Sequence, residues 1–478
     1  MVGNNQQISV RKNPIGQLDG AILVLFFLYG LASQYTLLTL IAGVVFVVLL
    51  KSLWKPYTPP VFLYFIGLQW LQVFACILYA DFLGEKLDLL FDSYDLTFLF
   101  TVTFLQLLAI IFVLRNYVRP QARRVVNRDV MREAVQQLNT KNVIIGYIVM
   151  AIVLPLVRVL TRGNASLYQL VVSFGILKYV FLALLVFILL LKTDTNKPLI
   201  VGILLFDFVL SFASFFSDFK TLLILIIIVY FTVNPNLSRR AIMRMVPIVV
   251  ALLFFFSFWS YVKGGYRAYL NQGSGAQVQT VSNTEALVYM FNQVVNFDVS
   301  SVWDGAAILL SRVQYMERYS EVYKRVPSEI NYKGGEELLS VFEFLLVPRF
   351  INPDKGVKDA SLRTSYYTGK RFSSSSQGTS ISMGYFCDFY IDFGLYFMFI
   401  PIIFLYMLIG NVYKRIINAD KYNILLVYAI AIGFFLSLGA FESDSLFFLG
   451  KLRNNLAFMV IGYYTFFTPL QKFLLSKK

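Results

Sequence analysis

The sequence predicts an all-helical polytopic membrane protein of about twelve transmembrane helices, with one large polar segment between the ninth and the tenth. Three observations support this fold class. Hydrophobic residues make up 58% of the 478-residue chain and charged residues only 14%, whereas soluble domains carry about a quarter charged residues. Apolar runs long enough to cross a bilayer recur along the chain. Basic residues gather in the short segments between those runs.

Twelve apolar runs are candidates for spanning helices, because each reaches or approaches the roughly 20 residues that a membrane crossing needs. The first run follows a basic start and has no small-residue cleavage site after it, so we expect it to be a retained span and not a signal peptide. The eighth run is short, and little separates the first two. The runs cover residues 19–34, 37–53, 60–80, 96–114, 143–161, 167–192, 198–216, 221–234, 246–262, 385–410, 424–440 and 447–468.

The basic residues also orient the chain. Segments 115–142, 235–245 and 411–423 and the carboxyl-terminal tail each hold two or more Lys or Arg residues, and the positive-inside rule places them in the cytoplasm. The acidic loop 81–95 and the segment 263–384 then lie outside, with both termini inside. Topology therefore explains the net charge of +15 more simply than nucleic-acid binding does.

This topology divides the chain into three parts. Residues 1–262 form an amino-terminal bundle of about nine spans, residues 263–384 form the outer segment, and residues 385–478 add about three spans. The outer segment is too long and too apolar to be a structureless loop, so we expect it to fold back on the membrane surface and cover a cavity. Residue spacing predicts helices within it, over 283–297, 299–325 and 336–346.

The residue types restrict the chemistry. The chain contains no histidine, which removes the commonest general base and the commonest metal ligand. Its two cysteines, Cys76 and Cys387, lie in apolar runs and are expected to be buried free thiols. No phosphate-binding loop, dinucleotide-binding glycine pattern, zinc motif or Asp-x-Asp motif is present. We therefore expect neither a metal nor a cofactor.

Cations near the outer boundary run against the positive-inside bias and need another explanation. Either they form ion pairs with carboxylates such as Asp354 and Asp388, or they bind a polyanionic ligand, because the guanidinium fork of Arg suits phosphate oxygens. Their clustering near one membrane face favours an anion site. The residues are Arg158, Lys220, Lys263, Arg267, Arg312, Arg349, Lys355 and Arg363.

Two carboxylates stand at the start of the tenth span. Asp388 and Asp392 are four residues apart, so they share one face of the helix. Carboxylates at membrane depth are costly and usually line a cavity, which indicates a functional role. A helix N-terminus alone also favours negative charge, which indicates a structural one.

Several short stretches resemble one known family. They are Trp259–Arg267, Arg312, Val347–Lys355, and Thr379-Ser380 with Asp388–Gly394. Together with the layout of most of the chain, they resemble the bacterial O-antigen polymerase (Wzy-type) family of oligosaccharide repeat-unit polymerases. The chain departs from the family pattern at Asp388, where Glu is common. It also has Asp218-Phe219 where the family often has Gly before the basic residue that corresponds to Lys220.

The resemblance implies a membrane glycosyltransferase of the bacterial inner membrane that needs no metal or cofactor. The donor would be a polyprenyl-pyrophosphate-linked oligosaccharide at the periplasmic face. The growing chain would move onto the next lipid-linked unit, and polyprenyl pyrophosphate would leave. The product would be O-antigen or an exopolysaccharide. The implied partners are lipid-linked oligosaccharides, the lipid bilayer, a chain-length regulator and a flippase, with no nucleic acid.

Within this scheme the charged residues receive roles. Fixed cations would stabilise the departing pyrophosphate, and a carboxylate would take the proton of the attacking sugar hydroxyl. The candidate catalytic residues are Asp388, Arg312 and Arg349. The candidates for binding pyrophosphate or sugar are Lys263, Arg267, Lys355, Arg158, Lys220, Arg363 and Asp354, of which Asp354 is also the second choice of base.

Three alternatives stay open. An O-antigen ligase would use the same donor with another acceptor, but ligases often carry a functional histidine, which this chain lacks. A lipid-linked sugar transporter or flippase would need a charged pathway in mid-span, where charges are few. A non-enzymatic subunit of an envelope complex is the third. The charges within the apolar runs are Lys178, Asp207, Lys451 and Arg453.

Overall fold

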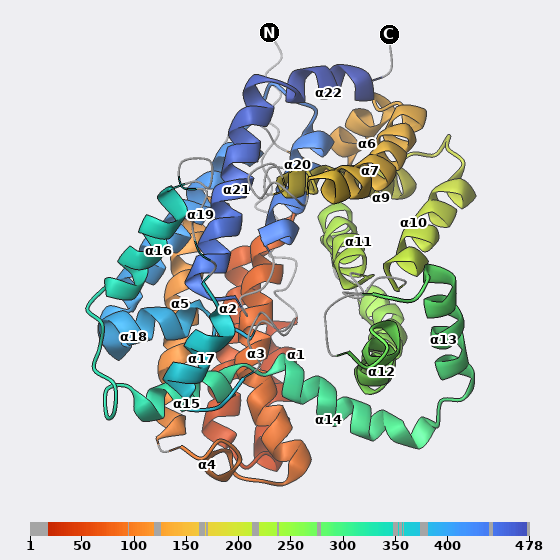
Figure 1. Cartoon of the computed structure of the whole chain (residues 1–478). Coiled ribbons are helices and arrows are strands. Elements are labelled where there is room, and N and C mark those ends of the chain that lie inside the picture. The colour runs from red at the N-terminus through yellow and green to blue at the C-terminus, as the bar shows by residue number, and fades with distance from the viewer. Residues whose placement is uncertain are drawn as a thin grey trace, which may run out of the picture.

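The protein is an assembly of packed helices, seen here in a computed structural model (Figure 1). Apart from one bridge between Leu138 and Leu475, every element in the described part of the chain is helical. The structure describes residues 18–93, 95–118, 126–161, 168, 171–212, 219–236, 239–274, 279–347, 352, 356, 358–372, 381–438 and 443–475.

The helices follow the apolar runs of the sequence. The first are α1 (Asp19–Ala32), α2 (Thr36–Leu53), α3 (Val61–Leu83), α4 (Leu87–Leu90), α5 (Leu96–Val118), α6 (Arg128–Gln136) and α7 (Thr140–Leu160). Next come α9 (Ile176–Leu191), α10 (Lys197–Phe212), α11 (Phe219–Val233) and α12 (Arg239–Leu270). The following segment holds α13 (Asn283–Val295), η1 (Val299–Ser301), α14 (Val302–Val313), α15 (Met316–Arg325), α16 (Glu336–Leu346) and α17 (Ala360–Thr368). The last are α18 (Tyr385–Phe397), α19 (Phe399–Ile417), α20 (Ile424–Leu438), α21 (Ser445–Tyr464) and α22 (Phe467–Leu474).

Seven helices of the described residues are long and apolar enough to cross a membrane, and they indicate a membrane protein. Only 22% of the most apolar window of α7 and 11% of that of α12 is buried, so lipid is the solvent that suits their exposed faces. The predicted count of about twelve spans stays a prediction. The seven are Thr36–Leu53, Val61–Leu83, Leu96–Val118, Thr140–Leu160, Val171–Leu191, Ala241–Leu270 and Phe399–Ile417.

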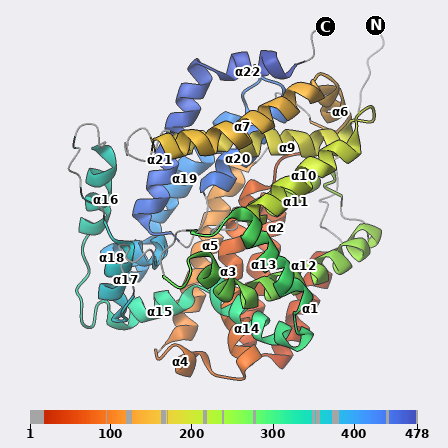
Figure 2. The ribbon, with the colours of Figure 1, turned by 45° about the vertical axis from the view of Figure 1, so that its right-hand side comes forward.

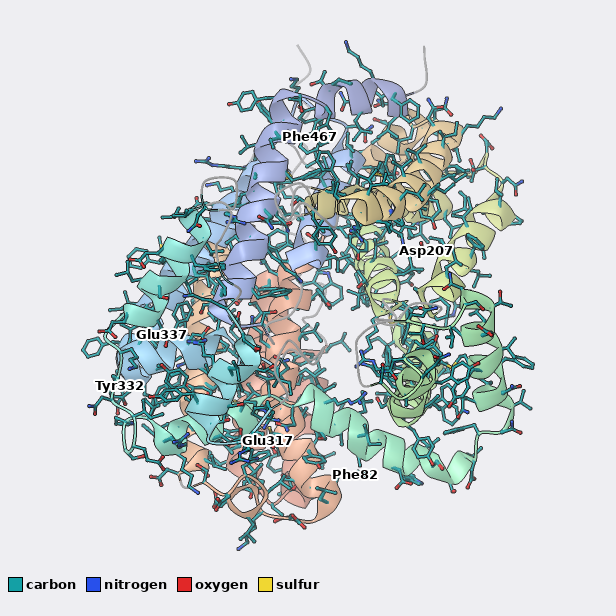
Figure 3. All side chains as sticks on the ribbon, in the orientation of Figure 1. Phe82, Asp207, Glu317, Tyr332, Glu337 and Phe467 are labelled. Atoms are coloured by element: carbon teal, nitrogen blue, oxygen red, sulfur yellow. The ribbon has the colours of Figure 1, made fainter. Side chains whose placement is uncertain are left out.

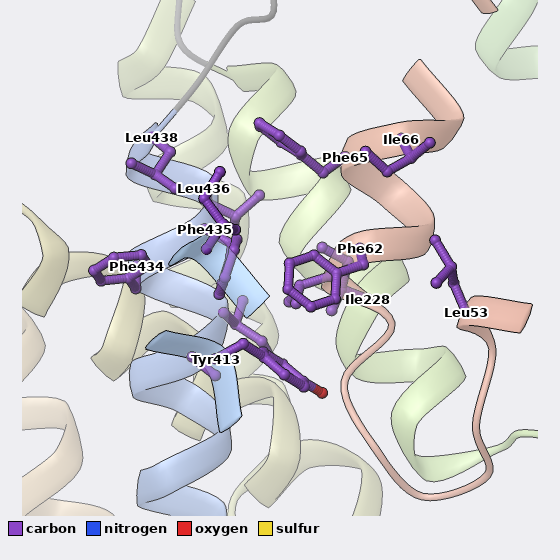
Figure 4. Packing of buried hydrophobic residues seen from close by; sticks show 14 of the residues in the cluster. Leu53, Phe62, Phe65, Ile66, Ile228, Tyr413, Phe434, Phe435, Leu436 and Leu438 are labelled. Carbon is purple, nitrogen blue, oxygen red and sulfur yellow. The ribbon is translucent and has the colours of Figure 1, made fainter. Parts of the chain in front are cut away.

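The largest core lies where helices from both halves of the chain meet. The ring of Phe62 in α3 lies 4.8 Å from that of Tyr413 in α19 and 5.0 Å from that of Phe435 in α20 (Figure 4). Ile228 of α11 joins the same cluster. Helix α20 is apolar on all sides and almost entirely buried, as expected of a helix with no polar face. Cys76 and Cys387 are buried free thiols, as predicted.

One basic and one acidic segment that the charge pattern assigns to opposite sides lie at opposite ends of the molecule. Helix α6 from the basic segment lies beside α22 at one end, whereas α4 from the acidic loop lies with α14 and α15 at the other, in both views (Figures 1 and 2). The boundary placed at residue 263 falls within a helix, because α12 continues without a break to Leu270.

Two sequence predictions need correction. The run 385–410 is not one unbroken helix: α18 is kinked at Gly394, which has a φ of 68°, and α19 begins at Phe399. The predicted helix 299–325 is also divided, into η1, α14 and α15. By contrast, the helix predicted over 336–346 has those bounds in α16.

Candidate functional site

Two helices bring together two of the predicted cations. Helix α14 packs against α12 so closely that a Cβ at Gly305 would lie 2.2 Å from the backbone oxygen of Ser257. Glycine is therefore required at this crossing. Towards the carboxyl ends of the same helices, Arg267 of α12 and Arg312 of α14 lie near enough for their like charges to repel each other. We call these two residues the arginine pair.

The arginine pair leaves one guanidinium available. Arg312 forms neither a hydrogen bond nor an ion pair with any part of the chain that the structure describes. Partial burial lowers the pKa of Arg312, although a guanidinium stays charged at any physiological pH. Two repelling cations held on rigid helices favour a bound anion, because an anion would relieve their repulsion.

Lys263 belongs to α12, and Lys220 belongs to α11, which contacts α12. The ring of Phe219 at the start of α11 lies 5.4 Å from that of Trp259 in α12. Lys220 directly follows Phe219 on α11, and Lys263 stands one turn after Trp259 and one turn before Arg267 on α12. The structure thus brings Arg267 and Arg312 together, and Lys263 stands on the same helix as Arg267.

Arg158 belongs to a different contact. It lies in the last turn of α7 beside Gly175, where a Cβ would come within 2.8 Å of a guanidinium nitrogen. Gly175 directly precedes α9. The Nε atom of Arg158 is buried and has no hydrogen-bond partner among the described residues. Arg158 therefore stands at the junction of α7 and α9, and no contact within the described residues links it to the arginine pair.

Arg363 forms the ion pair that the sequence left open. Its Nη1 atom lies 2.5 Å from the carboxylate of Asp388, and its Nε atom donates to Glu337 at 3.0 Å. The hydroxyl of Tyr367 also donates to Glu337, at 2.6 Å. We call Glu337, Arg363 and Asp388 the ion-pair network. It joins α16, α17 and α18 on the side of the molecule where Figure 3 labels Glu337.

Both carboxylate oxygens of Asp388 have a partner in this arrangement. Its second oxygen accepts a hydrogen bond from the backbone N–H of Ser445 at 2.5 Å, and the side chain is 6% exposed. The surrounding space, walled by Val341 and Phe389, has no room for a water molecule. In this arrangement Asp388 neutralises Arg363 and does not face a site that a sugar hydroxyl can enter.

Charge is well matched within the ion-pair network. Burial alone would raise the pKa of Glu337, but Arg363 and the hydroxyl of Tyr367 hold it below its usual range. For Arg363, burial alone would lower the pKa, but Asp388 and Glu337 raise it. Both side chains therefore stay charged as a buried pair, which is stable only when its hydrogen bonds are satisfied.

Asp392 has a structural role. Its two carboxylate oxygens accept the backbone N–H groups of Glu337 at 3.0 Å and Leu338 at 2.8 Å. These groups open α16, where a carboxylate also complements the helix dipole. The negative charge thus stabilises the N-terminus of a neighbouring helix and not that of α18, on which Asp392 stands.

Asp444 is an acidic group near the ion-pair network whose carboxylate pairs with no cation among the described residues. It caps α21 by accepting the N–H of Phe447 at 2.8 Å. Burial and the neighbouring charge of Asp388 raise its pKa from 3.8 to about 6. In the sequence Asp444 is only an acidic residue in a loop, because its approach to Asp388 depends on how α21 packs.

Glu337 is the main residue that the sequence does not reveal. Glu336 and Glu337 both stand in the first turn of a helix, where acidic residues are common, so nothing local marks Glu337 as the partner of Arg363. Three predicted site residues, Arg349, Asp354 and Lys355, lie outside the described residues.

The site and fold together define an all-helical membrane protein with an arginine pair on α12 and α14. The family described as a domain of unknown function (DUF8712) matches residues 124–422, more than half of the chain, and the chain belongs to it. That range contains both the arginine pair and the ion-pair network. No curated protein and no solved structure matches the chain.

Proposed function

We propose that the protein polymerises polyprenyl-pyrophosphate-linked oligosaccharide repeat units into a surface polysaccharide, such as O-antigen or an exopolysaccharide. The reaction is a glycosyl transfer at the periplasmic face of the bacterial inner membrane that needs no metal ion. The observation that carries the proposal is the arginine pair: two repelling guanidinium groups, one of them without a partner among the described residues.

A pyrophosphate leaving group fits these cations. When the bond between the anomeric carbon and the pyrophosphate oxygen breaks, the oxygen keeps the electron pair and negative charge develops on the phosphates. Fixed cations aimed at that charge lower the barrier, because the protein has already held them in place. Each guanidinium can bind two phosphate oxygens side by side. Arg267 and Arg312 would hold the diphosphate, with Lys220 and Lys263 near it.

The attacking group is a hydroxyl of the acceptor sugar. Its oxygen forms the new bond to the anomeric carbon, and its proton passes to a base. For Asp388 to be that base, Arg363 must first release it. A substrate phosphate that attracts Arg363 would weaken the ion pair, and the space around the carboxylate, which has no room for a water molecule, must also open. Asp354 is the second candidate for the base.

The experiment compares surface glycan on a gel from a deletion strain and from strains complemented with wild type, Arg312→Ala or Arg132→Ala. Arg132 is a matched control, because it is a half-exposed arginine of α6 at the other end of the molecule. We expect a single repeat unit in the deletion strain and in Arg312→Ala. Wild type and Arg132→Ala should restore a ladder.

Other outcomes contradict the proposal in distinct ways. A deletion strain without any repeat unit would support a flippase or a ligase. An unchanged ladder in the deletion strain would mean that the chain acts on another molecule. A full ladder with Arg312→Ala, at equal protein in the membrane fraction, would remove the arginine pair from the mechanism.

A further inference from the structure

A second cavity lies away from the arginine pair and the ion-pair network. It has a volume of about 380 Å³, within the range of small-molecule sites. Its walls come from the start of α5 with the residues before it, from α15 and the chain after it, and from α18. Among the described residues that line it, four are tyrosines, and we call the cavity the tyrosine pocket. The tyrosines are Tyr323, Tyr332, Tyr390 and Tyr396.

The tyrosines are arranged around one buried ring. The ring of Tyr390 lies 5.8 Å from that of Tyr323 and 5.9 Å from that of Tyr332. The Tyr390 hydroxyl donates to the backbone oxygen of Val326 at 2.5 Å, which fixes the ring. Tyr332 is 43% exposed and Tyr396 is 73% exposed. The pocket thus offers a rigid aromatic floor and two accessible rings at its mouth.

The backbone break in α18 makes room for one of these rings. Gly394 has a φ of 68°, and a Cβ there would lie 3.1 Å from the ring of Tyr332. A residue with a side chain would meet both a strained backbone and this ring. The kink within α18 therefore also shapes the pocket.

Charged groups stand at the edge of the tyrosine pocket. Asp95 has an exposed carboxylate that forms neither a hydrogen bond nor an ion pair within the described ranges, and its charge acts on the hydroxyl of Tyr323. Lys324 lies on the same wall and forms an ion pair of 2.7 Å with Asp92. A ligand in the pocket would therefore meet aromatic faces, phenol hydroxyls and an available carboxylate.

We infer that the tyrosine pocket binds a sugar ring of the acceptor glycan. A sugar ring has C–H faces that pack on aromatic rings and hydroxyl edges that donate to carboxylates and phenols. Tyrosines in membrane proteins also form belts at the lipid interface. Here the tyrosines line a cavity together with Asp95 and Lys324, whereas the tyrosines of such a belt would each face lipid.

The position of the pocket suits an acceptor that reaches the arginine pair. Tyr323 follows Arg312 through a short link and most of α15, so the two residues lie at most about 25 Å apart. An oligosaccharide of several rings can extend over that distance. The inference rests on the proposed function for the identity of the glycan, but the binding itself does not depend on polymerisation.

The test measures binding by the full-length protein in detergent. The probe is the repeat-unit oligosaccharide released by mild acid from the lipid-linked pool of the deletion strain, and saturation-transfer NMR reports its affinity. We expect Tyr396→Ala and Asp95→Asn each to weaken binding about five- to tenfold, the loss of roughly one aromatic or hydrogen-bond contact. Tyr464→Ala, at an 80% exposed tyrosine of α21, is the control and should bind as wild type does.

The outcomes separate this inference from the polymerase proposal. Equal binding by wild type, Tyr396→Ala and Asp95→Asn, or no binding by wild type, would overturn the pocket and leave the ladder result unaffected. If the deletion strain keeps its ladder, the polymerase proposal fails. The same binding experiment, with repeat units hydrolysed from the surface glycan of that strain, would still decide whether the pocket takes sugar.

Discussion

Arg363 and Asp388 form a 2.5 Å ion pair where α17 meets the first turn of α18. Asp388 is also held by the N–H of Ser445, so α21 joins the same contact. A carboxylate that the sequence suggests as a base is thus, in the folded chain, the point at which three helices are tied together. Its structural and chemical roles can be separated by experiment.

Removing either partner of this ion pair should destabilise the protein. Asp388→Asn leaves Arg363 with Glu337 as its one remaining partner in the network, and Arg363→Met leaves both carboxylates without their cation. We expect each variant to cost about 3 kcal/mol or more. The double variant Arg363→Met/Asp388→Asn should cost less than the sum of the two. Thermal unfolding in detergent measures all three. Asp388→Asn with wild-type melting but no polymer would instead assign Asp388 to catalysis alone.

The arginine pair should require guanidinium groups and not merely positive charge. Arg312→Lys and Arg267→Lys keep the charge but lose the fork that binds two phosphate oxygens. We expect polymer to fall by at least about tenfold in each, corresponding to roughly 1.4 kcal/mol of lost stabilisation. Gel densitometry of the glycan, normalised to protein in the membrane fraction, provides the measurement. Full activity of both lysine variants would argue against bidentate binding.

Asp444 should make stability depend on pH. Folding raises the pKa of its carboxyl group from the ordinary value of 3.8 to about 6, so the folded state holds the proton more tightly. Wild-type stability is therefore lost as pH rises from about 4 to 6. Asp444→Asn keeps the cap on Phe447 without the charge, and should be more stable than wild type by about 3 kcal/mol above pH 6. Thermal unfolding in detergent across this pH range measures the difference, which should vanish towards pH 4. A constant difference would contradict the assignment.

A charged pair within the candidate spans should be structural. Lys178 of α9 lies 2.7 Å from Asp207 of α10, and the hydroxyl of Tyr147 donates to the same carboxylate at 2.7 Å. Asp207→Asn should lower stability by about 3 kcal/mol, because Lys178 loses its counter-charge. Lys178→Met/Asp207→Asn should recover part of that loss. A stable Asp207→Asn protein that leaves repeat units undelivered would favour the transporter alternative.

The α12–α14 crossing should not tolerate a side chain. Gly305→Ala puts a methyl group against the backbone of Ser257, and we expect a cost of about 1–3 kcal/mol with loss of polymer. Gly264→Ala is the control, because no atom lies within 4 Å of its Cβ position. That variant should be neutral or stabilised by up to about 1 kcal/mol. Equal melting temperatures for the two variants would mean that the crossing can open without cost.

The local parts of the fold followed from the sequence. Helix α13 matches the predicted 283–297 closely, because Ser282 and Glu285 form a capping box at its start. The turn at Gly334 and Gly335 has positive φ angles, which glycine permits. Each of these features depends only on residues near each other in the chain.

The errors arose where distant contacts decide the backbone. The predicted helix 299–325 breaks at Gln314 and Tyr315, because the N–H of Tyr315 bonds to the backbone oxygen of Gln72 and Gln314 accepts from Cys76 of α3. Gly394 lies in a strongly apolar run, and glycine is common in spanning helices. Composition therefore gave no sign that the chain turns there.

The candidate site, too, could be predicted from the sequence only in part. The sequence could single out the Lys and Arg residues near the predicted outer boundary, because they run against the positive-inside bias. Which of them converge could not, since Arg267 and Arg312 meet only through the packing of α12 on α14. Arg363 was a candidate ligand contact, but it pairs with Asp388, which the sequence left open, and with Glu337, which carries no local sequence mark.

The length of α12 has a consequence for lipid composition. The uncharged stretch from Met245 to Val262 rises about 27 Å, close to the roughly 30 Å of a bilayer core. Lys263 and Arg267 follow directly, so the helix fixes their height relative to the phosphate headgroups. Longer acyl chains would draw these cations towards hydrocarbon and shorter ones would lift them into water. Bilayer thickness would then act as a control on how the protein engages a lipid-linked diphosphate.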